Sequence, residues 1–418
     1  MAKPNEPLEV SDAWDNPHYK ISNSVHGARK PVIRASSVSD RILLVYDHWT
    51  ASGGEGNKDP YYSISTNNGE SWPAGAAIVE TPDGSNQTVG ILDNNDTAWA
   101  LWVEHAPLLF SIAYTSKTEN GNWATVDKID EINTSDGILF DPDITVDDHN
   151  TVHVVWSRQV FSTLQHNIYY AYRAQGDADF SNPILIQASL PNSREPSIAV
   201  SSSGKLYIVW EEAVAGGGAE IRLSAGTISG GSFVVDPNLE YVKLSPDALS
   251  EVVLPQVSIH DNRMRVSYTN NLSLEYQGVY FGSCELPCYG FDANDFRSVS
   301  GLVSVNGNDP TNLVSDMAYA TGRKATFIFY HGAQNPSANE AILGTTSCQG
   351  WAGGYSNVAT DPGAYRAIEP SITITGNEIH LAYDRVSSSP SGFDHQIYVT
   401  KSELDCSNLV YLPVVNRK

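Results

Sequence analysis

Short strands of alternating apolar and polar residues recur along the whole chain. The most regular of them ends in an aromatic residue and is followed by a polar or charged pair. Seven copies occur, and they end at Tyr46, Trp102, Trp156, Trp210, Tyr268, Tyr330 and Tyr383. Consecutive aromatics are 56, 54, 54, 58, 62 and 53 positions apart. A repeat of this length indicates that each unit is one supersecondary element.

Each copy has similar neighbours, so the repeat contains more than one strand. An upstream strand often begins with Pro, as in residues 141–146, 195–200, 254–259 and 369–374. A third alternating strand follows the aromatic, as in 167–170 and 396–399, and a less regular fourth strand closes the unit. Alternation with period two is typical of β-strands, and no window has helical periodicity. The sequence therefore predicts an all-β fold, a seven-bladed β-propeller of four-stranded antiparallel blades.

The physical reason for a ring is burial. A single four-stranded sheet cannot bury both of its faces, so the blades stack face to face and the recurring aromatic packs between them. No linker or shift in composition divides the repeat. We therefore expect residues 31–418 to form one propeller domain and residues 1–30 to form an N-terminal segment that can contribute to ring closure. The closing strand is expected either from 18–21 or from 409–414.

Charge excludes several classes of partner. The chain has 48 acidic and 25 basic residues, and its formal net charge is -23. Nucleic acid and anionic membrane surfaces are poor partners for such a protein, because both require basic patches. No apolar run is long enough to span a bilayer. The composition predicts a protein without a nucleic-acid partner or a membrane span, and it leaves the oligomeric state open.

The expected location is outside the cell. Residues 1–4 lead directly into polar sequence without the apolar region of a secretory signal. The rest of the chain is acidic and rich in Asn, Ser and Tyr, a profile that is common among exported proteins. Residues 410–418 resemble the C-terminal tails of exported proteins from filamentous Chloroflexi-type bacteria. We expect a secreted or cell-surface bacterial protein whose signal peptide has been removed.

The four cysteines favour disulfides over a metal site. Cys284, Cys288, Cys348 and Cys406 lack the paired spacing and the histidines of a zinc site. Cys284 can pair with Cys288 and Cys348 with Cys406, but spacing alone leaves the pairing open. Acid-rich stretches such as 141–143 suit strand starts and turns equally well. We predict neither a metal site nor a cofactor.

Polar residues are expected to converge at one face of the ring. In a propeller, the ends of the second strands and the starts of the inner strands surround the axis on the same side. The residues that follow the recurring aromatics are Asp47, His48, Glu104, His105, Ser157, Arg158, Glu211, Glu212, Thr269, Asn270, His331, Asp384 and Arg385. The inner-strand starts add Lys30, Asn86, Asp141, Arg194, Glu195, Asp316, Arg366 and Glu369. This mixture of charges favours a hydroxyl-rich or carboxylate ligand.

One segment connects the repeat to a known family. Residues 65–72 resemble the Asp-box of sialidases, with Asn67 in place of the usual Asp. In such a turn, polar side chains bind the backbone, Gly permits positive φ and Trp packs beneath. The chain thus resembles sialidase-like BNR-repeat propellers, which are usually six-bladed. The resemblance implies a retaining glycoside hydrolase for terminal sialic-acid-type (nonulosonic acid) sugars, with a Tyr nucleophile, a carboxylate acid/base and a clamp of three arginines.

Only some of the residues that sialidases use for catalysis and substrate binding have a counterpart in this chain. Arg34 matches the first clamp arginine, and Lys30 fits the same register. The other two clamp positions hold Glu211-Glu212 and the Arg-free segment 337–340. The predicted catalytic residues are Asp59, Glu195 and Tyr365, with Glu55 and Tyr355 as alternatives for the first and the last. The predicted substrate-binding residues are Arg34, Asp47, His48, Glu55, His105, Arg158, Arg194, Glu212, His331, Arg366 and Arg385.

Two other functions fit the same residues. A non-catalytic lectin would bind sugars in shallow pockets between blades, although unequal blade tops favour one central site. A polysaccharide lyase for uronic-acid polymers would use a His or Tyr base and an Arg that neutralises the substrate carboxylate. The candidates for the lyase roles are His48, His105, His331, Tyr365 and Arg158. All three functions predict a carbohydrate partner.

Overall fold

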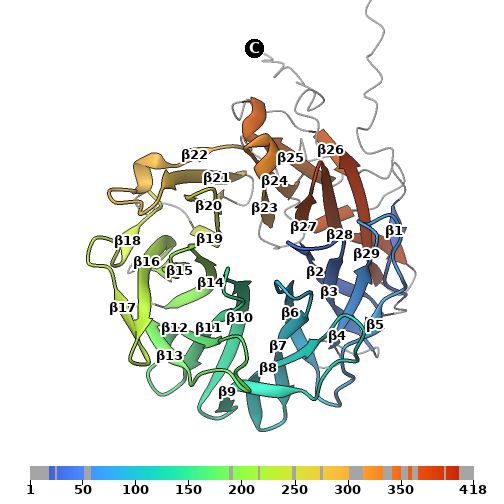
Figure 1. Cartoon of the computed structure of the whole chain (residues 1–418), viewed down its shortest axis with the longest axis horizontal. Helices are drawn as coiled ribbons and strands as arrows, with labels where there is room; N and C mark the ends of the chain where they lie inside the picture. Colours follow the sequence, from blue (N-terminus) through green and yellow to red (C-terminus); the bar gives the residue numbers. More distant parts are fainter. Residues whose placement is uncertain are drawn as a thin grey trace, which may run out of the picture.

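The computed structural model forms a ring of seven β-sheets around a central axis (Figure 1). It describes residues 18–23, 26–50, 58–187, 192–214, 217–246, 251–273, 276–300, 314–332, 341–349, 356–359, 366–389 and 392–403. Neighbouring strands within each sheet are antiparallel. Apart from β-strands, the described part of the chain contains only short 3-10 helices. The predicted seven-bladed β-propeller is confirmed.

Six blades are built in chain order, from the inner strand to the outer one. Blade 1 comprises β2(Ala28–Ala35), β3(Ile42–Trp49), β4(Lys58–Ser65) and β5(Ala76–Ala77). Blade 2 comprises β6(Ser85–Leu92), β7(Ala98–Ala106), β8(Leu109–Lys117) and β9(Asp127–Asn133). Blade 3 comprises β10(Gly137–Val146), β11(Val152–Val160), β12(Gln165–Arg173) and β13(Ile184–Gln187). Blade 4 comprises β14(Ser193–Val200), β15(Leu206–Ala213), β16(Ala219–Ser229) and β17(Ser232–Val235), and β18(Val242–Lys243) also pairs with β16. Blade 5 comprises β19(Glu251–His260), β20(Arg263–Ser273), β21(Tyr276–Glu285) and β22(Arg297–Ser298). Blade 6 comprises β23(Ser315–Ala320), β24(Ala325–Gly332), β25(Ala341–Thr346) and β26(Ser356–Ala359).

Blade 7 closes the ring with a strand from the other end of the chain. Its first three strands are β27(Arg366–Thr375), β28(Glu378–Ser389) and β29(Gly392–Glu403), and the fourth is β1(Tyr19–Lys20). Tyr19 pairs with Val399 in this antiparallel ladder, and Figure 1 shows β1 beside β29. The closing strand therefore comes from the 18–21 segment. The alternative segment 409–414 lies outside the described residues.

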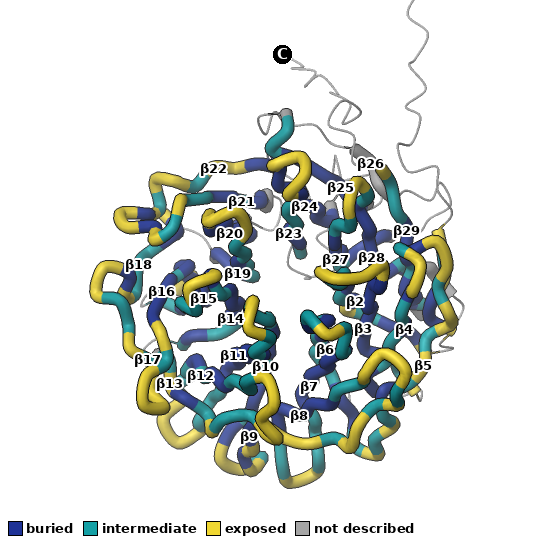
Figure 2. The backbone as a smooth tube through the Cα atoms, in the orientation of Figure 1, coloured by how far each residue is buried: buried dark blue, intermediate teal, exposed yellow. Residues whose placement is uncertain are grey.

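The core lies between the blades. The recurring aromatics are buried, and Trp102, Trp156 and Trp210 have no exposed surface. Apolar clusters join neighbouring blades; one of them contains Tyr46 of blade 1 and Ile397 of blade 7. Figure 2 shows that the strands are mainly buried and that the turns at the rims are exposed. As predicted, stacking of the blades buries both faces of each sheet.

Carboxylates satisfy the buried indole groups. Trp210 Nε1 donates to Glu212 Oε2 at 2.7 Å, and Ser193 Oγ donates to the same oxygen at 2.6 Å. Blade 2 repeats this arrangement, where Trp102 Nε1 donates to Glu104 Oε2 at 2.8 Å. A buried indole without an acceptor would destabilise the fold, so these acids stabilise the stacked blades.

The inner strands share a β-bulge. Where six inner strands shift register, one residue has a φ of 51–56°: Lys30, Gln87, Asp141, Glu195, Leu254 or Glu369. Five of the six precede a proline. Bulge side chains also join blades: Glu195 Oε2 accepts from Leu254 N at 2.9 Å, and Glu369 Oε2 accepts from Lys30 N at 2.8 Å. These two bonds run from blade 4 to blade 5 and from blade 7 to blade 1.

Residues 65–72 form a turn held by side chains. Asn67 Oδ1 accepts a hydrogen bond from Ser71 N at 3.1 Å, and Ser65 Oγ accepts one from Gly69 N at 2.9 Å. Trp72 packs against the apolar cluster between blades 7 and 1. Asn67 and Ser65 thus supply the acceptor oxygens that hold this turn.

The disulfide prediction is confirmed for one pair. Cys284 and Cys288 are bonded, with an S–S distance of 2.01 Å. Cys348 is also disulfide-bonded, and Cys406 lies outside the described residues. Within the ranges given above, no helix is long and apolar enough to cross a membrane.

Candidate active site

Several predicted site carboxylates stabilise the scaffold. Asp47 is 1% exposed, and its two carboxylate oxygens accept from Gln87 N at 2.9 Å and Thr88 N at 3.0 Å. It therefore joins blade 1 to the bulge of blade 2. Glu212 accepts the Trp210 and Ser193 hydrogen bonds described above. Both side chains are held by groups of the protein itself.

Asp59 and His48 lie opposite each other on β4 and β3. Asp59 is buried, and its Oδ1 accepts from Thr81 N at 2.8 Å and from Thr81 Oγ1 at 3.0 Å. The His48 ring stacks on Tyr61, with the ring centroids 4.0 Å apart. Burial lowers the pKa of His48 to about 4, although the Asp59 charge opposes this shift. His48 is therefore neutral at neutral pH.

The predicted arginines bind separate partners. The partners are Asp316 for Arg34 (3.3 Å), Asp130 for Arg158 (3.1 Å), Glu211 for Arg194 (2.6 Å) and the Tyr398 hydroxyl for Arg385 (3.0 Å). These four arginines come from four different blades, and the described partners just named are four different residues. A carboxylate clamp needs several guanidinium groups at one point. The contacts of these four do not provide that arrangement.

The remaining predicted residues divide between packing and undescribed positions. His105 packs edge-on against Phe110, and its Nε2 lies 3.2 Å from Asn86 Oδ1. His331 is buried, and its Nδ1 accepts from Val314 N at 3.3 Å. Glu55, Tyr355, Tyr365 and the side chain of Arg366 lie outside the described residues.

Blades 3 and 4 hold a cluster of carboxyl groups. Arg194 binds Glu211 Oε1 through Nε at 2.7 Å and Nη2 at 2.6 Å. Burial raises the pKa of Glu211, and the charge of Glu195 raises it further, while Arg194 opposes both effects. Burial and the charge of Glu195 also raise the pKa of Asp141. A carboxyl group that retains its proton beside an ionised one can act as a general acid.

A second cluster lies where blade 7 packs against blade 1. Ala382 and Ile397 both contact blade 1 through the apolar cluster that they share with Tyr46. Because side chains alternate along a strand, Asp384 and His395 lie on the same face, two positions from these core residues. Asp384 is fully buried, and its Oδ2 lies 2.7 Å from His395 Nδ1. β28 and β29 thus place an imidazole on a buried carboxylate.

Arg29 of blade 1 completes this cluster. Its Nη2 lies 2.7 Å from His395 Nε2, and its Nε lies 3.9 Å from Asp384 Oδ2. Arg29 Nε also lies 3.1 Å from His395 Nδ1, so the guanidinium group contacts both ring nitrogens. A carboxylate that orients an imidazole in this way is a recurring arrangement in general-base catalysis.

An aromatic ring and a second cation flank the imidazole. Trp49 lies 6.3 Å from His395 between ring centroids, and Lys58 Nζ and Arg29 Cζ lie 4.6 Å and 5.7 Å from the indole centroid. Gly27, with a φ of 116°, permits this packing, because a Cβ there would approach Trp49 to 3.1 Å and His395 to 3.4 Å. Arg29, Asp384 and His395 form what we call the imidazole cluster.

The sequence identified only part of this cluster. Asp384 was expected at the ligand-binding face, because it follows a recurring aromatic. Arg29 and His395 were not predicted. Arg29 precedes a bulge residue, as Arg194 does, so alignment of the repeats contains a signal for it. His395 belongs to a third strand, whose residues the blade-top pattern does not cover.

Comparison with known proteins establishes the fold and no family. No family model matches the sequence, and no curated protein matches it. Among solved structures, an ulvan lyase from a polysaccharide lyase family matches with a TM-score of 0.52 and 11% identity, over 76% of this chain and 78% of that one.

Two glycoside-processing enzymes resemble the chain less closely in space. An intramolecular trans-sialidase from Ruminococcus gnavus matches with a TM-score of 0.49 and 13% identity, over 92% of this chain and 96% of that one. An α-L-arabinofuranosidase from Fusarium graminearum has a TM-score of 0.47 and 9% identity, over 94% and 98%. At such identities the likeness concerns the propeller fold alone.

Proposed function

We propose that the protein is a carbohydrate-active enzyme for acidic sugars and that it cleaves uronic-acid polysaccharides by β-elimination at the imidazole cluster. The observation that carries the proposal is the 2.7 Å contact of His395 Nδ1 with the buried Asp384, together with Arg29 at Nε2. An oriented base next to a cation is what elimination beside a carboxylate requires. The Arg29 side chain is 31% exposed, so a ligand can reach it.

The proposed reaction begins when the uronate carboxylate binds the Arg29 guanidinium. This contact disperses the negative charge that develops when the C5 proton leaves. Once the guanidinium group has turned from His395 to the uronate, His395 Nε2 takes that proton, the electron pair forms the C4=C5 double bond, and the C4–O bond breaks. Where C5–H and C4–O lie on the same sugar face, the imidazolium returns the proton to the leaving oxygen. Asp384 stabilises the transient imidazolium.

Trp49 supports this assignment because it provides a flat apolar surface next to the base. A sugar ring presents C–H groups on its face and hydroxyl groups on its edge, so it can pack on an indole while its edge is hydrogen-bonded. Lys58 lies over the same ring and adds positive charge for an acidic substrate. The sugar would thereby be held with its carboxylate towards Arg29.

The test uses soluble uronate polymers, namely polyglucuronate, polygalacturonate and alginate. We expect at least one of them to give the ultraviolet absorbance of an unsaturated uronate, and the His395→Gln variant to give none. Circular dichroism and the thermal transition verify that the variant is folded. Absence of the absorbance on every polymer with folded wild-type protein, or full activity of His395→Gln, contradicts the proposal.

A second candidate is the sialidase-type glycoside hydrolase implied by the resemblance. It is favoured by the carboxyl cluster of blades 3 and 4, where Glu211 has a raised pKa and lies near Glu195. In this case Glu211 would supply the proton to the leaving group. Release of free sugar from neuraminic, Kdn or pseudaminic glycosides, without the unsaturated product and with loss in Glu211→Gln, would select it. The catalytic roles of Asp59 and Tyr365 remain predictions of this candidate.

A further inference from the structure

A pocket lies between blades 3 and 4 on the face opposite the imidazole cluster. Its volume is about 380 Å³, and it is lined by the start of β11, the end of β12, the turn between β14 and β15 and the end of β16. The imidazole cluster uses the ends of second strands, whereas this pocket uses their starts, so the two sites occupy opposite rims. This volume falls within the range of small-molecule sites.

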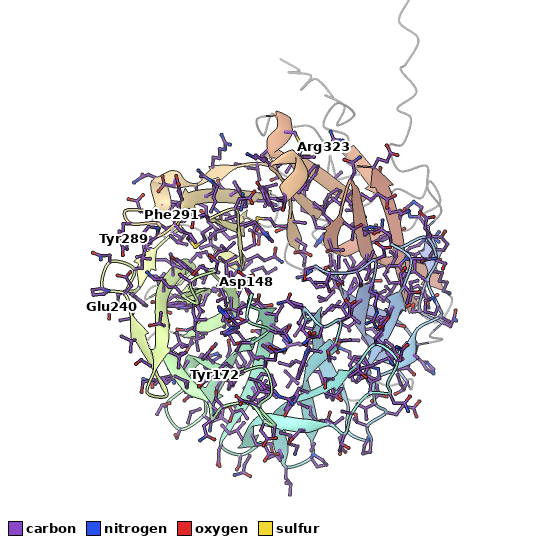
Figure 3. The ribbon with its side chains drawn as sticks, viewed as in Figure 1. Asp148, Tyr172, Glu240, Tyr289, Phe291 and Arg323 are labelled. Carbon is purple, nitrogen blue, oxygen red and sulfur yellow. A yellow bond between two sulfur atoms is a disulfide. The ribbon has the colours of Figure 1, made fainter. Side chains whose placement is uncertain are left out.

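One wall of the pocket is a row of nearly parallel rings. Tyr172 and Tyr170 lie two positions apart on β12, with centroids 6.0 Å apart and planes at 23°. His153 of β11 continues the row, 6.0 Å from Tyr170 with the planes at 27°. Tyr172, on blade 3 (Figure 3), is the half-buried end of the row, whereas Tyr170 is fully buried. The pocket therefore presents a flat aromatic surface at Tyr172.

Polar contacts hold this row in place. Tyr170 Oη lies 2.7 Å from His153 Nδ1, and His153 Nε2 lies 3.4 Å from Asp147 Oδ2. Asp147 Oδ1 also accepts from Thr151 N at 2.7 Å, which anchors the carboxylate to the turn. A surface that is rigid before binding loses little conformational entropy when a ligand binds.

Polar groups lie across from the aromatic wall. Ser203 and Thr227 are exposed and supply hydroxyl groups. Gly204 has open space where a Cβ would be. Burial raises the pKa of Asp147, but hydrogen bonds from His153 and the backbone lower it to about 2, so this carboxylate is ionised. The described residues that line the pocket include no Lys or Arg. An aromatic wall, hydroxyl groups and a nearby negative charge favour a neutral, hydroxyl-rich ligand over an acidic one.

We propose that this pocket binds one neutral glycosyl residue and serves as a non-catalytic anchor for carbohydrate. The apolar face of the sugar would pack on Tyr172, and its hydroxyl groups would face Ser203 and Thr227. The pocket gives the lectin interpretation a specific location. It does not depend on the proposed elimination, because it shares no residue with the imidazole cluster.

The probes are the methyl glycosides of glucose, galactose, xylose and rhamnose, which carry no carboxylate and cannot undergo the proposed elimination. We expect saturation-transfer NMR with the wild-type protein to detect at least one of them. Tyr172→Ala should weaken that ligand at least about tenfold, whereas Tyr172→Phe, which keeps the ring, should bind as the wild type does. Thr227→Trp, which fills the pocket from its exposed rim, should also abolish binding.

The matched control is Phe161→Ala, which removes an exposed aromatic from the opposite rim and should leave binding unchanged. If Tyr172→Ala does not fold, glycoside binding by Thr227→Trp tests the proposal instead. Failure of all four glycosides to bind, or undiminished binding by the pocket variants, overturns the proposal. Lyase activity on short uronate oligomers is measured in parallel. If this lyase activity persists while no glycoside binds, the proposal for the pocket is wrong and the proposed elimination is unaffected.

Discussion

Arg29 and Arg194 occupy the same position in two different blades, yet their surroundings differ. Each arginine directly precedes the bulge residue of its inner strand. Each is paired in the β-ladder with the acid that follows the recurring aromatic, Asp47 in blade 1 and Glu211 in blade 4. The repeat alone would predict the same ion pair twice.

The length of the acid accounts for the difference. Glu211 extends to Arg194 and binds it through two nitrogens. Asp47 is one methylene shorter and accepts two backbone hydrogen bonds from blade 2 instead. Arg29 contacts His395 of blade 7. The comparison shows that the arginine at this position of the repeat can contact a residue of another blade when the acid opposite it on the neighbouring strand binds other groups.

The largest expected effect concerns the base itself. His395→Gln should lower kcat on the responsive uronate polymer by about 10³-fold or more, because Gln has no basic ring nitrogen to take the C5 proton. His105→Gln, on blade 2, is the control and should change kcat by less than about threefold. Steady-state kinetics measures both. Comparable losses in the two variants would remove the distinction between the imidazole cluster and ordinary blade-top residues.

The two arginines can be compared directly. Arg29→Ala should lower kcat/KM by about 10²-fold through loss of a charge-assisted contact with the substrate carboxylate, whereas Arg194→Ala should remain within about threefold of the wild type. The same polymer assay applies to both. The reverse order would move the reactive centre to blades 3 and 4 and favour the hydrolase candidate.

We expect substitution of Asp47 to lower the free energy of unfolding more than substitution of Arg194. Asp47→Ala leaves two backbone N–H groups without their acceptor and should cost about 2–4 kcal/mol in the free energy of unfolding. Arg194→Ala should cost less, about 1 kcal/mol, because the Arg194 side chain is 41% exposed and because Glu211, whose pKa burial raises, can take up a proton once the guanidinium group is gone. Denaturant titration measures both values. Equal costs would show that Asp47 does not join the blades as described.

The smallest effect is a pH dependence at the interface of blades 7 and 1. Burial lowers the pKa of His48 from 6.5 to about 4. As the pH falls through this window, the unfolded chain binds a proton that the folded protein excludes, so stability decreases until both states are protonated. Allowing for solvent screening, the loss should be about 1–2 kcal/mol.

His48→Phe keeps a ring on Tyr61 and should flatten this part of the stability curve. The control is His149→Phe, whose parent side chain is 76% exposed and should leave the curve unchanged. Unfolding free energies measured at several pH values test both variants. An unchanged slope in His48→Phe would assign the titration to another group.

The fold was predictable because its signal is local. Alternation with period two marks each strand, and the recurring aromatic marks each unit, so the seven blades could be counted without tertiary information. The candidate site was only partly predictable. Asp384 follows one of those aromatics, but Arg29 and His395 are 366 residues apart and meet only because the ring closes. No local pattern relates them.

Several predicted residues illustrate the same limit. Asp47 and Glu212 stand where a ligand-binding face was expected, yet their oxygens accept hydrogen bonds from the backbone of blade 2 and from Trp210. Sequence position shows that such an acid lies at a blade top. It does not show whether the oxygens of that acid already accept hydrogen bonds from a backbone amide or an indole of the protein.

The sequence by itself determined the architecture, the number of blades and the acidic character of the protein, because strand periodicity and charge are properties of short segments. The tertiary structure decided which polar groups are held by the scaffold and which assemble at the blade 7–blade 1 interface. That decision depends on the reach of single side chains across blade boundaries. It also depends on β1 pairing with β29, which joins the first and the last of the described strands.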